Sequence, residues 1–248
     1  MSMGSAAGLV VEFVGLPGAG KSALSHQVAV LLRAEGLIVS EPTYRLDRVG
    51  TASRIFAKVG YGIGGAIAAP LTAARWMRTF LAMRQRSLTD TCRVALNWFF
   101  LSGLTRRLAR CPGVHLMDQG IFQGLWSAGY AARDGVPRGD EIVTAVLKVL
   151  PPRVLVIVVE TSPATLQLRL QARRDGNSRL ERDLTTATSA GWLAGALAAF
   201  SSLQGVLELL ERQEAIAVMR VQGEHAGQLQ ITAEAVAGRI TGAQWLSG

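Results

Sequence analysis

The sequence predicts an α/β fold in which a parallel five-stranded sheet carries helices on both faces. Short apolar segments alternate with longer segments in which apolar residues recur at helical spacing. The short segments are almost continuously apolar, as expected for strands of a parallel sheet that is covered on both faces. We predict strands at 9–14, 37–40, 114–117, 154–159 and 215–221, and helices at about 23–35, 89–110, 140–149, 163–174, 189–212 and 229–240.

The length and composition of the chain fit one globular domain. The 248 residues are 49% hydrophobic and 18% charged. This composition excludes a disordered chain, because it provides enough apolar side chains to bury a large core. We predict a single domain over residues 1–248. Two cysteines, Cys92 and Cys111, are too few for a disulfide scaffold and predict reduced thiols in a cytoplasmic protein. No basic stretch precedes the first apolar run, so we expect no signal peptide.

Positive charge is concentrated in one segment. The formal net charge is +8, yet residues 45–110 contain twelve arginines and lysines against two aspartates. A localised field of this kind attracts phosphates, lipid headgroups or nucleic acid. We interpret 45–110 as a helical basic insert in the α/β domain.

A glycine-rich loop follows the first predicted strand and precedes the first predicted helix. Residues 15–22 read GLPGAGKS and match the pattern G-x-x-x-x-G-K-[ST] in full. Glycines at such positions bring backbone amides close to phosphate oxygens, and the helix that follows aims its free N–H groups at the same anion. The loop therefore predicts a nucleoside triphosphate site, with Lys21 on the β- and γ-phosphates and the Ser22 hydroxyl on Mg²⁺.

Three further stretches accompany this loop. Glu41-Pro42 follows the second predicted strand, and Asp118-Gln119-Gly120 follows the third. After the fourth come Glu160-Thr161-Ser162-Pro163 and an arginine-bearing segment that we interpret as a lid over 169–183. Together these stretches resemble the P-loop kinases of the thymidylate kinase and deoxynucleoside kinase type. Gln119 departs from that pattern, because it stands where the family usually has an arginine.

The resemblance implies a P-loop NTPase-type fold, ATP and Mg²⁺, and transfer of the γ-phosphoryl group to a nucleoside, nucleotide or similar acceptor. It also implies catalytic roles for Lys21, Asp118, Glu41, Arg173 and Arg179, with Ser22 and Asp118 at the metal. Arg173 would additionally stack on the adenine. The residues expected to bind the nucleotide are Gly15, Pro17, Gly18, Ala19, Gly20, Lys21, Ser22, Ala23 and Arg173.

Each of these assignments has a structural alternative. Asp118 fits a helix N-cap or turn as well as a metal site. Glu41 fits either a general base or a solvated residue before a proline turn. The arginines of 169–182 fit a lid or an ordinary solvated helix face.

The acceptor and the partners stay open. The acceptor is a nucleoside or nucleotide, or a less usual molecule such as a sugar, an antibiotic, a lipid-linked intermediate or a modified base in DNA. A nucleotide-dependent ATPase or switch acting on a partner is a further alternative. The basic insert fits substrate-side helices, an interfacial element on anionic lipid or a nucleic-acid surface, and a homodimer is also possible.

Overall fold

A computed structural model describes residues 8–47, 60, 70–133, 140–172, 189–223 and 226–242. Its five strands form one sheet in the order β2-β3-β1-β4-β5, and every neighbouring pair is parallel. This confirms the predicted fold class. The strands are β1 (Leu9–Val14), β2 (Val39–Ser40), β3 (Val114–Met117), β4 (Val154–Glu160) and β5 (Ala217–Gln222).

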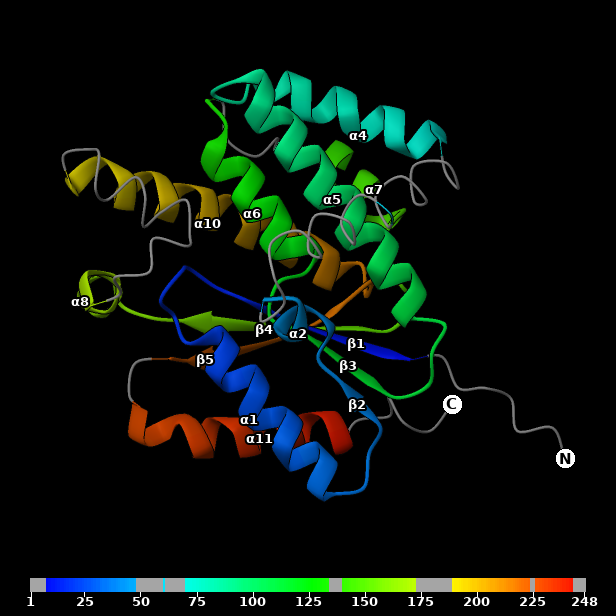
Figure 1. The fold of residues 1–248 in the computed structure, drawn as a ribbon, viewed down its shortest axis with the longest axis vertical. Coiled ribbons are helices and arrows are strands. Elements are labelled where there is room, and N and C mark those ends of the chain that lie inside the picture. The colour runs from blue at the N-terminus through cyan, green and yellow to red at the C-terminus, as the bar shows by residue number, and fades with distance from the viewer. Residues whose placement is uncertain are drawn as a thin grey trace, which may run out of the picture.

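Helices cover both faces of the sheet, as Figure 1 shows. On one face α1 packs against α11, while α5, α6 and α10 lie on the other. All six residues of β1 are buried as a result, and so are six of the seven residues of β4. The helices are α1 (Lys21–Ala34), α2 (Pro42–Asp47), α4 (Pro70–Ala82), α5 (Leu88–Leu108), α6 (Ile121–Ala131), α7 (Asp140–Leu147), α8 (Pro163–Ala172), α10 (Ser189–Arg212) and α11 (Leu229–Thr241).

Two strands begin later than predicted, because the preceding helices close with tight turns. The amide of Leu37 donates to the carbonyl of Leu32 in α1, so the strand starts only at Val39. Similarly, the amide of Ala215 donates to the carbonyl of Leu210, which delays β5 to Ala217. Apolar character alone did not distinguish these turn residues from the strands that follow them.

Within the described residues the basic insert is mostly helical and comprises the end of α2, α4 and α5. The connection at 83–87 is not helical, and Gln85 there forms an isolated bridge with Ala132. Of the predicted lid, only 169–172 belong to the described residues, as the end of α8. Arg173 and Arg179 lie outside them.

One stretch among the described residues, Leu193–Arg212 in α10, is long and apolar enough to cross a bilayer by length and composition. Leu203, Leu207 and Leu210 on this helix are fully buried in the main core. The apolar composition of α10 is therefore accounted for by packing against the sheet and its neighbouring helices.

Candidate functional site

The glycine loop connects the end of β1 to the start of α1. Gly18 and Gly20 have φ angles of 88° and 93°, a left-handed conformation that favours glycine. At Gly15 a Cβ atom would lie 2.6 Å from the carbonyl oxygen of Val159 in β4, so the loop passes close to the neighbouring strand. The predicted strand–loop–helix arrangement is thus present.

Lys21 is the first residue of α1, and its side chain folds back over the loop. Its Nζ donates to the carbonyl oxygens of Gly15 at 2.9 Å and Leu16 at 3.0 Å. These carbonyls hold the ammonium group against the loop, at the amino end of α1, where the helix dipole is positive. The charge of Lys21 and the helix dipole therefore favour an anion at the same end of α1.

Ser22 and Asp118 meet although they lie far apart in the sequence. The Ser22 hydroxyl donates to Asp118 Oδ2 at 3.0 Å, and the amide of Asp118 donates to the Thr43 hydroxyl at 3.1 Å. Asp118 follows β3 directly, and parallel strands bring their carboxyl ends to the same edge of a sheet. The helix N-cap alternative is wrong, because α6 has its N-cap at Gly120.

This pair fits a magnesium ion by its own chemistry. Asp118 is 2% exposed and its Oδ1 has no hydrogen-bond partner, which leaves a buried carboxylate oxygen beside the Ser22 hydroxyl. Hydroxyl and carboxylate oxygens are the hard donors that Mg²⁺ prefers, usually with waters and substrate phosphates completing its shell. No group of three or more His, Cys, Asp or Glu within the described ranges could hold a metal by itself.

Glu41 is buried, so its interpretation as a solvated residue is wrong. Its side chain is 5% exposed, and Arg33 Nη2 donates to its Oε2 at 2.7 Å. Its Oε1 lies 3.0 Å from Nδ1 of His26, whose ring stacks on Tyr44 with centroids 4.8 Å apart. Both carboxylate oxygens are therefore engaged, one by an arginine and the other by a half-exposed histidine.

Two segments of the chain beyond β4 contact the glycine loop. Arg169 Nη1 in α8 donates to the carbonyl oxygen of Gly18 at 3.2 Å. A Cβ atom at Gly223, which follows β5, would lie 2.5 Å from the carbonyl oxygen of Ala19. The predicted arginine-bearing segment thus begins in direct contact with the loop.

A second buried carboxylate near the loop was missed by the sequence analysis. Glu12 in β1 is 3% exposed, and its Oε1 accepts from the amide of Gln123 at 2.8 Å. The side-chain carbonyl of Gln123 in turn accepts from the amide of Gly15 at 3.2 Å. Glu12 and Gln123 therefore connect the start of α6 to the first glycine of the loop. A lone glutamate in the apolar run LVVEFV is the one sequence feature that could have indicated such a role.

Burial raises the pKa of Glu12 to about 8, although amides of the first turn of α6 act in the opposite direction. At Gly120 a Cβ atom would lie 2.3 Å from the carboxyl carbon of Glu12. A larger residue at 120 would therefore have to displace the buried carboxyl group of Glu12.

Neither a protein-family model nor a curated protein sequence matches this chain. Solved structures do resemble it. Thymidylate kinase from Candida albicans is 16% identical, with 96% of this chain and 94% of that one covered and a TM-score of 0.49. EHV4-TK, a herpesvirus thymidine kinase solved with TP4A, is 13% identical, with 95% and 90% covered and a TM-score of 0.40.

The parallel sheet, with the glycine loop between β1 and α1, is that of the predicted P-loop NTPase-type α/β fold. With identities of 13–16% and TM-scores below 0.5, the likeness to these kinases says nothing of the chemistry, which depends on the residues of this chain's own site.

Proposed function

We propose that the protein is an ATP- and Mg²⁺-dependent phosphotransferase that moves the γ-phosphoryl group of ATP to a small molecule of the nucleoside or nucleotide class. One observation carries this proposal. Lys21 and Ser22 begin a helix directly after the glycine loop, and Asp118 places a buried, partly unpaired carboxylate on Ser22. A phosphate-binding loop with a metal-binding pair beside it is the arrangement that phosphoryl transfer requires.

In this proposal Lys21 exchanges the carbonyls of Gly15 and Leu16 for oxygens of the β- and γ-phosphates. Ser22 and Asp118 would hold Mg²⁺, which supplies positive charge between the same phosphates. Arg173 and Arg179 would neutralise further charge and keep water away from the reacting group. An acceptor oxygen forms a bond to the γ-phosphorus while the bond to the bridging oxygen breaks, leaving ADP.

A hydroxyl acceptor also has to lose a proton, and Glu41 is the candidate base. Because both its oxygens already have partners, a hydroxyl would reach Glu41 by taking the place of His26, whose side chain is 46% exposed against 37% for Arg33. If the acceptor group were a phosphate, it would need further positively charged side chains to bind it rather than a base. Gln119 is exposed and uncharged where the kinase pattern has arginine, which favours a hydroxyl acceptor.

The test is a coupled assay for ADP release against nucleosides, nucleoside monophosphates, sugars and amphiphilic natural products, compared with ATP alone. We expect one class to stimulate turnover. Lys21→Ala should lower that turnover about a thousandfold, since preorganised charge at transferring phosphates contributes several kcal/mol. Lys148→Ala is the control, because Lys148 is exposed and follows α7.

An active Lys21→Ala variant would contradict the phosphate-site assignment. Hydrolysis of ATP that no acceptor stimulates would favour the nucleotide-dependent ATPase or switch instead.

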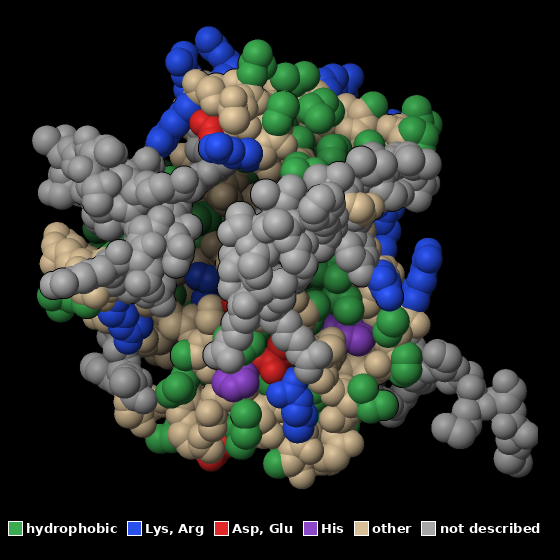
Figure 2. Space-filling view, in the orientation of Figure 1, with side chains coloured by type: hydrophobic (Ala, Val, Ile, Leu, Met, Phe, Trp, Pro, Cys, Tyr) green, Lys and Arg blue, Asp and Glu red, His purple; other side chains and the backbone are tan. Residues whose placement is uncertain are grey.

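For the basic insert, the described surface favours anionic lipid over nucleic acid. Leu71, Leu81 and Leu88 are 81%, 54% and 77% exposed, and Figure 2 shows hydrophobic and basic side chains together over the α4 end of the molecule. Trp76 and Phe80, the aromatic residues of α4 that could stack on bases, are buried. We expect sedimentation with phosphatidylglycerol vesicles, weakened by Leu71→Asp combined with Leu81→Asp, and no sedimentation with phosphatidylcholine vesicles. Binding to single-stranded DNA but not to vesicles would contradict this assignment.

A further inference from the structure

The backbone amide of Asp118 is held by a side chain where the sheet pairing stops. β2 and β3 are parallel, and Ser40 lies beside His115. Continued in the same register, Thr43 would lie beside Asp118, but β2 ends at Ser40 and the chain enters α2 at Pro42. The Thr43 hydroxyl instead accepts from the Asp118 amide at 3.1 Å. One side-chain hydrogen bond thus replaces the pairing that the backbone of β2 no longer provides.

Thr43 can hold this amide firmly because its own segment is fixed on two sides. Thr43 is 6% exposed, and α2, which begins one residue before it, packs against β3 (Figure 1). Glu41, two residues earlier, is bound by two side chains of α1. The Ser22 hydroxyl, also on α1, donates to Asp118. Hydrogen bonds therefore run from α1 to the segment 41–43, from there to Asp118, and back to α1.

The backbone of Asp118 determines where its carboxylate lies. Asp118 stands between β3 and α6 and belongs to neither element. Its Oδ2 accepts from Ser22, and its buried Oδ1 has no hydrogen-bond partner. Groups that orient a metal ligand from behind matter for binding, since their loss typically lowers metal affinity about 10- to 100-fold. The Thr43 hydroxyl is placed to act as such a group on Asp118.

We propose that Thr43 is a positioning residue for magnesium binding: its hydroxyl fixes the backbone of Asp118 and so keeps the carboxylate beside Ser22. This inference rests on the proposed function, because it needs Mg²⁺ at Ser22 and Asp118. In this role Thr43 acts through Asp118 and is not itself a metal ligand. Valine would keep the shape of the side chain and lose the acceptor, whereas serine would keep the hydroxyl.

The test compares the affinity of the full chain for ATP in MgCl₂ and in EDTA, measured by calorimetry. We expect Mg²⁺ to strengthen ATP binding by the unchanged chain. Thr43→Val should lower the affinity in MgCl₂ about tenfold and leave the affinity in EDTA as it is, because only the metal ligand is displaced. Thr43→Ser should bind ATP like the unchanged chain in both buffers. Thr144→Val, the same change at an exposed position of α7, is the matched control.

Hydrogen exchange at the Asp118 amide, followed by NMR without nucleotide, gives a second measurement that needs no ligand. Exchange should be about tenfold faster in Thr43→Val, because the amide has lost its acceptor. It should be unchanged in Thr43→Ser. Unchanged exchange in Thr43→Val would overturn the proposal, because the hydroxyl would then not hold the amide.

Failure of the magnesium site and failure of the positioning role give different results. If the unchanged chain binds ATP no more tightly in MgCl₂ than in EDTA, the magnesium site is wrong and the role of Thr43 falls with it. If Mg²⁺ strengthens ATP binding equally in Thr43→Val and the unchanged chain, only the positioning role is overturned. An equal loss of affinity in both buffers, or a loss that Thr43→Ser does not restore, would also overturn it.

Discussion

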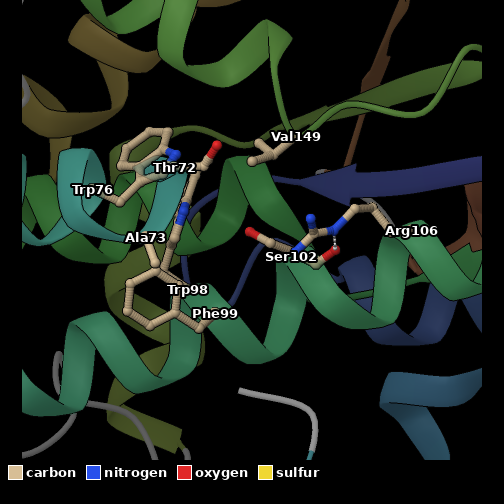
Figure 3. Close-up of a pocket in the computed structure, with 8 residues that line it drawn as sticks. All are labelled: Thr72, Ala73, Trp76, Trp98, Phe99, Ser102, Arg106 and Val149. Atoms are coloured by element: carbon tan, nitrogen blue, oxygen red, sulfur yellow. Dashed lines mark hydrogen bonds between the residues drawn. The ribbon is translucent and has the colours of Figure 1, made fainter. Parts of the chain in front are cut away.

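The glycine-loop side of the sheet and the contact between α4 and α5 differ in how their buried polar groups are paired. Beside the loop, Ser22 bonds to Asp118, and Glu41 bonds to Arg33 and His26. Glu12 is likewise held by the first turn of α6. Where α4 packs against α5 (Figure 3), Nε1 of Trp76, Nε1 of Trp98 and the Ser102 hydroxyl are buried without a hydrogen-bond partner.

The difference shows which region is held in shape by its own polar side chains. Paired groups on the loop side would lower the ordering cost of the proposed nucleotide binding. Two buried atoms on this side have no partner, Oδ1 of Asp118 and Oγ of Ser25, and the first lies where we propose the metal.

The largest expected effect concerns the pairing of Glu12. Its pKa is about 8 in the folded chain against 4.5 without burial, so the folded chain holds this proton more tightly. Below pH 4.5 this proton contributes its full stabilisation to the free energy of unfolding. As the pH rises to 8, the contribution is lost, by up to about 5 kcal/mol. Glu12→Gln mimics the protonated form, so urea unfolding should show it more stable than the unchanged chain at pH 9 and similar to it near pH 5.

Glu208→Gln provides the control, because Glu208 is exposed on α10 and should leave the pH dependence as it is. If the free energy of unfolding depended on pH in the same way for Glu12→Gln and the unchanged chain, the amides of α6 would be holding Glu12 as an anion.

Asp118→Asn tests the unpaired carboxylate oxygen beside the glycine loop. The amide keeps the size of the carboxylate and can still accept from Ser22, yet it removes the negative charge that would bind Mg²⁺. We expect turnover to fall about a hundredfold and the Mg²⁺ concentration for half-maximal rate to rise. Steady-state rates over a series of Mg²⁺ concentrations measure both. An unchanged Mg²⁺ dependence would remove Asp118 from the metal site.

Gly120→Ala tests how closely α6 is fitted to Glu12. The backbone of Gly120 has φ −127°, which alanine adopts freely, so the expected strain comes from the clash with the Glu12 carboxyl. We expect a loss of about 2 kcal/mol in the free energy of unfolding. Gly205→Ala on the exposed side of α10, where a Cβ meets nothing within 4 Å, should instead gain up to about 1 kcal/mol. Equal values for the two variants would mean that Glu12 does not lie against Gly120.

Ser102→Ala carries the smallest expected effect and tests the unpaired region. Removing a buried hydroxyl that has no partner should raise the free energy of unfolding by about 1 kcal/mol. Ser201→Ala, at an exposed position of α10, gives the part of this gain that comes from helix propensity, and chemical denaturation of both variants measures the difference. A gain no larger than that of Ser201→Ala would show that the Ser102 hydroxyl is already paired, and the contrast between the regions would disappear.

The sequence predicted the parts of the fold that depend on short-range patterns. Continuous apolar runs identified the five strands, and the spacing of Gly15, Gly20, Lys21 and Ser22 identified the glycine loop between β1 and α1. The meeting of Ser22 with Asp118 also followed, because parallel strands end at one edge of a sheet.

What the sequence could not predict depends on contacts between distant side chains. No feature of the sequence around Glu41 indicates that it would be buried against Arg33. Likewise, no feature around Glu12 indicates that its carboxyl group would accept a hydrogen bond from an amide of α6. Apolar periodicity places Trp76 and Trp98 inside the protein, but it does not say whether their N–H groups find acceptors. The roles of Arg173 and Arg179 remain predictions.

The bond from Arg169 to the carbonyl of Gly18 has a consequence for the order of events when a nucleotide arrives. A triphosphate on the loop carries far more negative charge than one carbonyl oxygen, so it competes for that guanidinium from a short distance. In the proposed function, the nucleotide would therefore draw Arg169 away from the carbonyl of Gly18, and the end of α8 would lose this tie to the loop.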